Sequence, residues 1–201
     1  MEKIMILNGS PRAVRSNSRR YSEIFSKKSK CKTEYFNILK TNHHNLCSKM
    51  AEFRDVLLVF PLYADGIPVT LLDFLKTLEL NPPKSKPVVS VLINCGFLEH
   101  GQNDTAVCMI KLFCEKNGYR FGSVLKIGSG EAILDSPFKI LVKGKIKKLA
   151  SSICNLRYRA LHTTMPIPAK AFVKAAEKYW VNYGAKNGVT KEEMRTMKIE
   201  E

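Results

Sequence analysis

The sequence predicts an α/β fold built on a parallel sheet. Five short apolar runs that are typical of strands alternate with segments whose apolar residues recur at helical spacing. Strands separated by helices need crossover connections, and these connections place neighbouring strands in parallel. Apolar residues make up 45% of the chain and charged residues 25%, which are ordinary values for a globular protein and argue against a disordered one.

The expected strands are residues 3–8, 32–39, 55–60, 87–94 and 119–127. Residues 55–60, Asp-Val-Leu-Leu-Val-Phe, are almost wholly apolar, which is typical of a central strand covered on both faces. The expected helices are residues 18–28, 43–54, 69–80, 104–117 and 138–154. In the last of these, Val142, Ile146 and Leu149 share one side and lysines occupy the other, which predicts a solvated basic face.

Residues 156–201 form an extension that a five-stranded domain at residues 1–155 does not need. Two prolines make residues 162–168 extended. Residues 169–183 then carry an aromatic stripe at helical spacing, which we expect to pack onto its own domain or onto a second subunit. Thr190-Lys-Glu-Glu193 is a capping-box pattern and predicts a short final helix.

The six cysteines are scattered along the chain without a Cys-x-x-Cys pair, so we expect no metal or iron–sulfur site. The first ten residues hold too short an apolar stretch for a signal peptide, which predicts a cytoplasmic protein with reduced cysteines. No apolar run approaches the ~20 residues that span a bilayer, and we expect no membrane partner.

The charge of the chain favours anionic partners. Lysine and arginine number 33 against 18 aspartate and glutamate residues, for a formal net charge of +15. Such a field attracts nucleic acid, acidic lipid or phosphorylated ligands. Because the sequence lacks an RNA-binding motif with interleaved aromatic residues, we expect no nucleic-acid partner and assign the field to phosphorylated cofactors.

Ligands of a parallel α/β sheet bind outside the carboxyl ends of the strands, which directs attention to the loops after strands one, three and four. The first loop, residues 8–18, opens a helix whose N-terminus presents unpaired N–H groups and a positive dipole end to a phosphate. Helix capping explains one or two of its polar residues but not their concentration. The candidate phosphate ligands are Ser10, Arg12, Ser16, Asn17 and Ser18. Neither a P-loop nor a Gly-x-Gly-x-x-Gly motif is present, which argues against nucleotide hydrolysis and Rossmann-type NAD binding.

The other two loops suit a planar ring. In residues 61–68, two prolines stiffen the chain, Gly66 permits a tight turn and Tyr63 offers a ring beside backbone amides, although an ordinary connection with a packed Tyr63 is the alternative. In residues 94–103, Gly96 allows close backbone approach and Phe97 adds a ring. His100 is more typical of a solvated loop histidine than of a catalytic base.

Together these segments resemble the flavodoxin-like NAD(P)H-dependent FMN reductase family. The resemblance covers about residues 1–135. It rests on Leu7-Asn-Gly-Ser-Pro-Arg12 with Ser16-Asn-Ser18, on Pro61-Leu-Tyr63 with Gly66-Ile-Pro68, and on Asn94-Cys-Gly-Phe97 with Glu99 and Gln102-Asn103. It implies a flavodoxin-like five-stranded sheet in the order 2-1-3-4-5, with helices on both faces. The iron–sulfur flavoproteins among its relatives carry a cysteine cluster in the first half, where this chain has only Cys31 and Cys47.

The resemblance also implies a cofactor and a reaction. The first loop would hold the phosphate of FMN, Pro61, Leu62, Tyr63, Ala64, Asp65 and Gly66 would border its ring, and Asn94, Gly96 and Phe97 would close the other side. Amides from Ala64 to Gly66 would donate to the ring. Hydride would pass from NADPH or NADH through FMN to a small acceptor such as a quinone, a nitro compound or free flavin. This chemistry needs no general acid or base, so no catalytic residue is assigned. The family also suggests a homodimer or larger homo-oligomer.

Two other functions stay open at this point. An FMN-binding electron carrier of the flavodoxin type would share the loops, but flavodoxins meet their partners through acidic surfaces and this chain is basic. A module that binds nucleic acid or an anionic surface would reuse the fold without a cofactor. The net charge is the only observation that supports this function.

Overall fold

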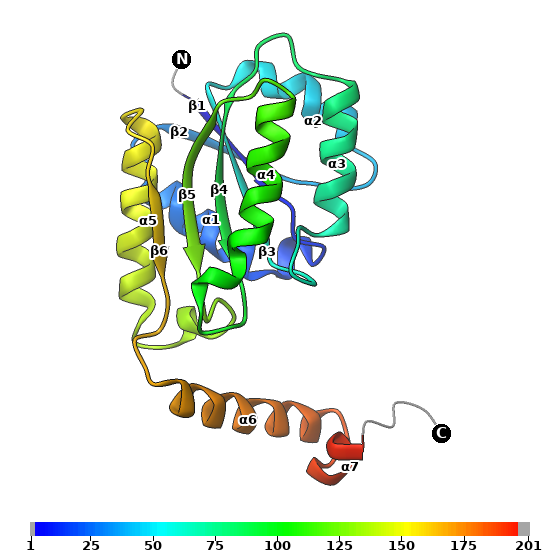
Figure 1. Ribbon diagram of the computed structural model, residues 1–201, viewed down its shortest axis with the longest axis vertical. Helices are drawn as coiled ribbons and strands as arrows, with labels where there is room; N and C mark the ends of the chain where they lie inside the picture. Colours follow the sequence, from blue (N-terminus) through cyan, green and yellow to red (C-terminus); the bar gives the residue numbers. More distant parts are fainter. Residues whose placement is uncertain (1–2, 197–201) are drawn as a thin grey trace. The chain divides into compact units, whose positions relative to one another are not determined.

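The computed structural model describes residues 3–196 of the chain (Figure 1). The chain divides into two compact units between Met165 and Pro166. The first unit holds a parallel sheet with helices on both faces, as the alternating pattern predicts. The second unit holds two helices and is described by itself below.

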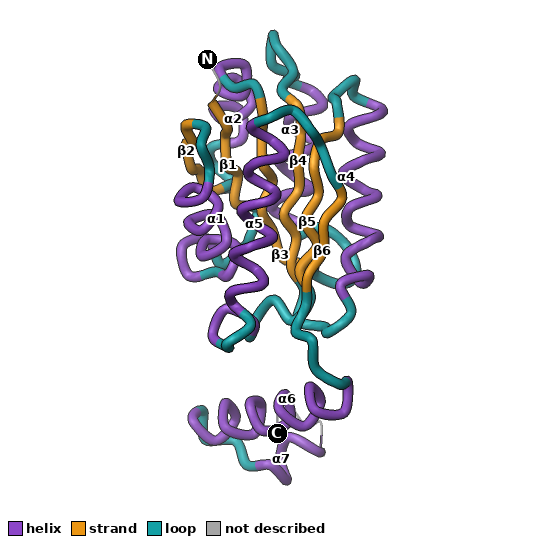
Figure 2. Tube along the Cα trace, turned by 90° about the vertical axis from the view of Figure 1, so that its left-hand side faces the viewer, coloured by secondary structure: helices purple, strands orange, loops and turns teal. Residues whose placement is uncertain are grey.

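The sheet has six strands in the order β2-β1-β3-β4-β5-β6, and every neighbouring pair is parallel (Figure 2). The strands are β1 (Lys3–Asn8), β2 (Lys32–Asn37), β3 (Asp55–Pro61), β4 (Val88–Asn94), β5 (Phe121–Ile127) and β6 (Ala160–Thr163). The predicted order of the first five strands is confirmed. The three central strands β1, β3 and β4 are almost wholly buried, because helices cover both of their faces.

The prediction of a five-stranded sheet is wrong, because β6 adds a sixth strand at the edge. Ala-Leu-His-Thr has no apolar alternation to mark it as a strand. It is held by main-chain bonds to β5, in which the amides of Val124 and Gly128 donate to the carbonyls of Arg159 and Thr163, each at 2.9 Å. The sequence had placed these residues in the extension expected at 156–201. The structure divides the chain after Met165, ten residues beyond the expected boundary at 155.

Helices cover the two faces of the sheet in a group of three and a group of two. α2 (His43–Lys49), α3 (Val69–Leu80) and α4 (Asp104–Lys116) bury Leu46, Phe74 and Ile110 against one face. α1 (Asn17–Lys28) and α5 (Lys139–Cys154) pack against each other over the opposite face (Figure 1). Both groups bury apolar side chains at helical spacing, which is the main source of stability in such a fold.

Two cysteines that are distant in sequence lie next to each other in the structure. Cys31 precedes β2 and Cys154 ends α5, and their Cα atoms are 5.9 Å apart, a separation at which a disulfide can form. The expectation of reduced cysteines stays a prediction. Their separation of 123 residues explains why spacing gave no signal, since only the packing of α1 on α5 brings the two ends together.

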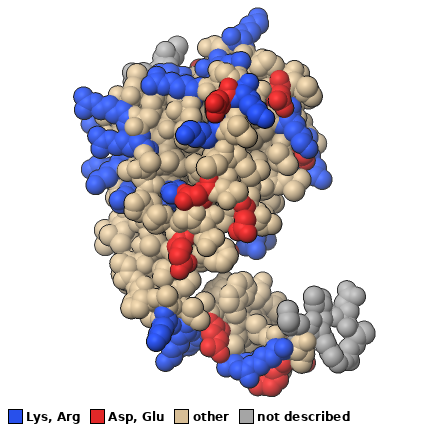
Figure 3. Space-filling model, in the orientation of Figure 1, with Lys and Arg blue, Asp and Glu red and all other residues tan. Residues whose placement is uncertain are grey.

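The outer side of α5 is basic. Lys139, Lys143, Lys147 and Lys148 are exposed, and Figure 3 shows lysine and arginine side chains gathered over this helix, at the left of the view. Val142 and Ile146 on the inner side are fully buried. The division of the helix into a buried apolar side and an exposed basic side is as predicted. Across residues 3–196, no helix combines the length and apolar character needed to cross a membrane.

The second unit is a pair of packed helices, α6 (Ala169–Lys186) and α7 (Lys191–Thr196). The predicted capping box is confirmed, because the amide of Thr190 donates to Glu193 Oε2 at 2.7 Å and the amide of Glu193 donates to Thr190 Oγ1 at 3.2 Å. α7 packs beside Gly184, where a Cβ would lie 2.7 Å from Met194 Sδ. The rings of the aromatic stripe on α6, Tyr179, Trp180 and Tyr183, are about half exposed.

Candidate functional site

A cavity of about 210 Å³ lies at the edge of the sheet where β1, β3 and β4 end. These strands end at Asn8, Pro61 and Asn94, and the register pairs Pro61 with Asn94. The loops after them therefore converge, as expected for a parallel sheet. The lining residues are Ser10, Arg12, Ser16, Asn17, Ser18, Pro61, Leu62, Tyr63, Asn94, Cys95, Gly96 and Glu131.

Most of the residues chosen from the sequence line this cavity. The first loop contributes its α1 end, which consists of Ser10, Arg12, Ser16, Asn17 and Ser18. The other two loops contribute its aromatic end, which consists of Pro61, Leu62, Tyr63, Asn94 and Gly96. Four residues expected at the ring, Ala64, Asp65, Gly66 and Phe97, are not among the lining residues. The structure thus assembles the predicted loops, while the roles of their residues stay predictions.

The α1 end presents donors toward the cavity. Ser16 caps α1 by accepting the amide of Arg19 at 3.1 Å, and the first amides of a helix have no acceptor within the helix itself. The Ser18 hydroxyl is buried and has no hydrogen-bond partner within the described part of the chain. Asn17 Oδ1 accepts a hydrogen bond from Arg20 at 3.1 Å, so Nδ2 is the atom of the Asn17 side chain that can donate to a ligand. A buried, unpaired hydroxyl beside a helix N-terminus is the arrangement that an oxyanion satisfies.

Arg12 stands at the rim of the α1 end and faces an acidic residue. Its Nη1 lies 3.9 Å from Glu131 Oε1, and both side chains are more than half exposed. Such a long, solvated pair contributes little to stability. The guanidinium is therefore able to turn to another anion at small cost.

The aromatic end contains a strained turn. Tyr63 and Gly66 exchange two backbone hydrogen bonds, at 3.1 and 2.9 Å, and the two residues between them, Ala64 and Asp65, have φ values of 45° and 54°. Positive φ at both central positions defines a type I′ turn. The expected tight turn is present, but its left-handed residues are Ala64 and Asp65 and not Gly66. The amide of Gly66 already donates within the turn, so the expected ring donors from 64 to 66 reduce to the first two.

The third loop is tied to the second and leaves its own backbone open. Leu62 donates its amide to the carbonyl of Asn94 at 2.8 Å, and Asn94 Nδ2 donates to the carbonyl of Phe60 at 3.2 Å. A Cβ at Gly96 would meet no atom of the described residues within 4 Å, so a planar group can approach this backbone closely. Tyr63 is 42% exposed and Phe97 53%, which leaves both rings available beside the cavity.

Two lining residues were missed by the sequence reasoning, Cys95 and Glu131. Cys95 is buried, and burial raises the pKa of its thiol, which keeps the thiol neutral. Glu131 follows β5, whose loop was not considered. The rule that all parallel strands end at the same edge was the signal that pointed to this loop as well. Gly130 packs there against Asn94, with the position of a Cβ only 2.7 Å from Asn94 Cβ.

His100 lies outside the residues that line the cavity. Its ring stacks on His162 with the centroids 4.1 Å apart, so it is not the freely solvated histidine that the sequence suggested. Burial, followed by the neighbouring His162, lowers the pKa of His100 and favours the neutral ring. The described residues contain no cluster of three or more His, Cys, Asp or Glu side chains that could hold a metal ion.

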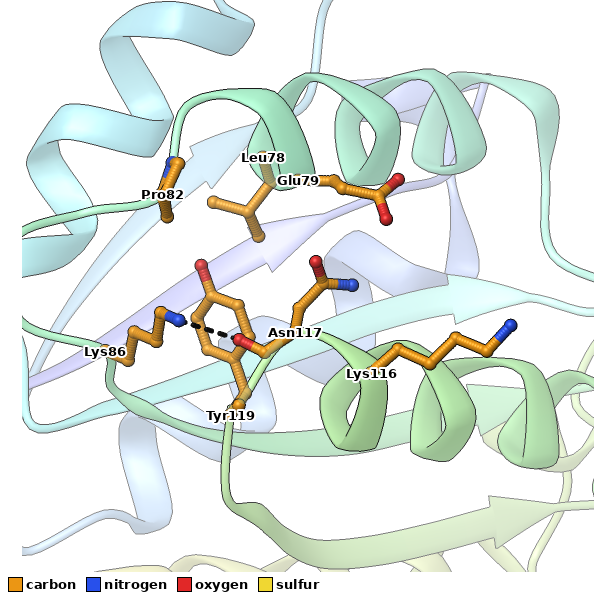
Figure 4. A pocket seen from close by; sticks show the side chains of 8 residues that line it. Leu78, Glu79, Pro82, Lys86, Lys116, Asn117 and Tyr119 are labelled. Atoms are coloured by element: carbon orange, nitrogen blue, oxygen red, sulfur yellow. Dashed lines mark hydrogen bonds between the residues drawn. The ribbon is translucent and has the colours of Figure 1, made fainter.

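A second hollow of about 380 Å³ lies at the opposite edge, where α3 and α4 end and β4 and β5 begin (Figure 4). It is larger, and its buried Tyr119 hydroxyl has no hydrogen-bond partner within the described residues, but its Lys86 serves the fold. Lys86 Nζ donates to the carbonyl of Asn117 at 2.8 Å and lies over the ring of Tyr119. Ligands of parallel α/β sheets bind at the edge where the strands have their carboxyl ends. The loops after β1, β3 and β4 line the smaller cavity at that edge, so we assign the candidate site to it.

Comparisons with known proteins identify the fold. No family model and no curated protein matches the sequence. Among solved structures, the chain is similar to an FMN-dependent NADH-azoreductase from Bacillus anthracis str. Ames Ancestor in complex with FMN, with 15% identity, a TM-score of 0.57 and coverage of 77% of this chain and 100% of that one.

Two further structures show the same likeness. A flavodoxin from Streptococcus pneumonia TIGR4 is 12% identical with a TM-score of 0.56, over 78% of this chain and 99% of that one. An NAD(P)H:quinone oxidoreductase from Methanothermobacter marburgensis is 13% identical with a TM-score of 0.53, over 78% and 98%. The first unit of the chain has a flavodoxin-like fold.

Proposed function

We propose that the protein is an FMN-dependent oxidoreductase that transfers hydride from NADPH or NADH to a small acceptor such as a quinone, a nitro compound or free flavin. One observation carries the proposal. The unpaired, buried Ser18 hydroxyl stands at the N-terminus of α1, at one end of a cavity whose other end has the exposed Tyr63 ring and the open backbone at Gly96. A phosphate at the first end and a planar ring at the second match those two surfaces.

The residues present fit FMN. Ser18, Asn17 and the first amides of α1 would hold the phosphate, with Arg12 turning from Glu131 to neutralise it. The cavity volume of about 210 Å³ is below the roughly 300–1,000 Å³ of pockets that enclose small ligands. The flavin ring would therefore lie beside Tyr63 and extend past the cavity toward Phe97, and both of these side chains are exposed.

The side chains and backbone of the protein would position the bound cofactor and would not take part in the chemical step. Bound FMN supplies two-electron redox chemistry, and the protein supplies orientation and electrostatics. The strained turn would present the amides of Ala64 and Asp65 to the ring, and the hydrogen bond from Leu62 to Asn94 ties the two loops that would border the ring. The open space at Gly96 would let the ring approach this backbone closely. The nicotinamide donor and the small acceptors are proposed from the likeness to the NADH-azoreductase and the NAD(P)H:quinone oxidoreductase.

The spectrum of the purified protein tests this function. We expect bound flavin, or uptake of added FMN, and bleaching of the flavin absorbance by NADPH or NADH. A colourless protein that takes up no FMN contradicts the proposal.

A pair of arginine variants tests the placement of the phosphate. Arg12→Ala removes a lining charge and is expected to weaken FMN binding about tenfold, which is the scale of one charge-assisted hydrogen bond. Arg15→Ala removes the same charge from an exposed residue of the same loop that does not line the cavity, and we expect little change. Equal effects of the two variants would show that only the general field matters.

A flavodoxin-type electron carrier is the second candidate, because the likeness to a flavodoxin is as strong as the likeness to the reductases. Stopped-flow mixing separates the two functions. A carrier stays oxidised with NADPH and NADH until a partner reductase is added, whereas the proposed enzyme is bleached directly.

A further inference from the structure

Asn8, the last residue of β1, is a fully buried polar residue that does not line the cavity. Buried amides are normally satisfied by partners, and those of Asn8 show what the residue organises. Its Oδ1 accepts the amide of Ser10 at 3.0 Å. Its Nδ2 lies at 3.1 Å from the carbonyl of Ala13 and at 3.3 Å from Ser16 Oγ. Asn8 thus contacts the first loop near its start, at its middle and at the cap of α1.

The same amide also reaches β2. Asn8 Nδ2 lies 2.9 Å from the Tyr35 hydroxyl and 3.2 Å from Asn37 Oδ1, and Tyr35 itself donates to Asn37 Oδ1 at 2.6 Å. The register places Asn37 directly beside Asn8 in the sheet. The two N–H groups of Asn8 are therefore shared among four acceptors, two in the loop and two on the neighbouring strand. The network anchors the loop to the sheet.

The loop needs such an anchor, because part of it is strained. Ala13 has a φ of 44°, a left-handed conformation that alanine rarely adopts. Ser16 Oγ donates to the carbonyl of Ala13 at 2.6 Å while it accepts the amide of Arg19. Asn8 holds both of these groups, so it sets where α1 begins. Strain of this kind persists only where surrounding contacts determine the backbone.

We infer that Asn8, supported by Tyr35 and Asn37, is a positioning residue that holds the α1 end of the cavity in the geometry that binds a phosphate. The inference rests on the proposed function, because the phosphate is that of FMN. Asn8 itself touches no ligand in this account. Its effect reaches the ligand through Ser10, Ser16 and the first amides of α1.

The test compares FMN with riboflavin, which carries the same ring without the phosphate. A residue that positions only the α1 end changes the affinity for FMN and leaves that for riboflavin nearly unchanged. A residue that merely stabilises the fold changes both affinities together, or neither. The ratio of the two dissociation constants is therefore the readout, with the melting temperature measured in parallel on the full chain.

We expect Asn8→Ala to raise the dissociation constant of FMN at least about tenfold and that of riboflavin less than about twofold, as loss of several net-favourable hydrogen bonds predicts. Tyr35→Phe removes one link and should change the ratio in the same direction by about threefold. If Asn8→Ala does not fold, Tyr35→Phe decides the question. Ser90→Ala is the matched control, because Ser90 is fully buried and accepts the amide of Ser123 in the middle of the sheet.

The outcomes are distinguishable. A wild-type protein that binds neither flavin overturns the proposed function and this inference with it. A wild-type protein that binds FMN, together with variants whose ratio stays at the wild-type value, overturns the inference alone. A control that moves the ratio as much as Asn8→Ala also overturns it, because loss of stability then explains the effect.

Discussion

The two ends of the cavity are held in different ways. At the α1 end, side chains fix the backbone, since Asn8 and Ser16 bond to the loop at several points. At the aromatic end, two non-glycine residues keep a strained turn between β3 and α3, and the neighbouring rings stay exposed. A network of buried hydrogen bonds suits one ligand group of fixed shape, whereas open backbone and exposed rings accommodate more than one planar partner. The difference fits one resident phosphate and two successive ring substrates.

The largest expected effect comes from Gly130, which lies between α1 and the loop after β4. The carbonyl of Gly130 accepts the Tyr21 hydroxyl of α1 at 2.6 Å, and its Cα faces Asn94. Gly130→Ala would force a methyl group against Asn94 and should lower the free energy of unfolding by about 1–3 kcal/mol. Denaturant unfolding measures this change. Gly144→Ala is the control, because space is open around that exposed helical glycine, and it should stabilise by about 0.5–1 kcal/mol.

Loss of a cap should weaken the α1 end next. Ser16→Ala removes the acceptor of the Arg19 amide and the donor to Ala13 and should lower the free energy of unfolding by about 1 kcal/mol. FMN binding should weaken as well, since the same side chain positions the start of α1. Calorimetric unfolding and an FMN titration give the two values. A variant with unchanged stability would show that the α1 end does not depend on this cap.

At the aromatic end, a substitution should raise the free energy of unfolding, whereas Ser16→Ala at the α1 end lowers it. Ala64→Gly relieves a left-handed alanine and should raise the free energy of unfolding by about 0.5–1 kcal/mol. FMN affinity should fall, because the amides at the turn lose their fixed direction. A gain in stability without any loss of affinity would show that the strain has no part in binding. Gly66→Ala provides a contrast, since its φ is not in the left-handed region and a Cβ would have only ordinary contacts.

The smallest expected effect depends on pH. Arg20 donates to Asp135 Oδ2 at 2.9 Å, and this hydrogen bond lowers the pKa of Asp135. Because a carboxyl with a depressed pKa binds its proton more weakly in the folded state, the pair stabilises the fold above the unfolded pKa of about 3.9 and loses this contribution as pH falls through the lower folded value. Both side chains are well exposed, so Arg20→Ala should cost no more than about 1 kcal/mol at pH 7 and less at pH 2. Thermal melts at the two pH values give the difference, and an equal loss at both would contradict an electrostatic origin.

The site was predictable where local chemistry marks it. Hydroxyl and amide side chains after β1, and rings and glycines after β3 and β4, stand directly behind recognisable strands, and the geometry of parallel sheets brings such loops together. Ala64 and Asp65 show the limit of this reasoning. The turn was predicted from Gly66, but the positive φ values lie on the two residues before it.

Residues that act through distant partners left no local signal. Glu131 faces Arg12 across more than a hundred positions of sequence, and Asn8 meets Tyr35 only because β2 lies beside β1. Neither residue type is unusual for its segment. Their roles depend on which side chains the fold places opposite them, and such contacts cannot be read from spacing alone.

By itself, the sequence determined the α/β fold class and the edge of the sheet where the loops converge, because hydrophobic periodicity and strand-end composition are local properties. The order of the first five strands was implied only by the family resemblance, since periodicity does not say which strands are neighbours. Only the tertiary structure decided the sixth strand, the proximity of Cys31 to Cys154 and the buried network around Asn8, because each depends on contacts between segments far apart in the chain. The strained turn at Ala64 is closed by local bonds between Tyr63 and Gly66, but the residue types gave no signal that Ala64 and Asp65 would take the positive φ values.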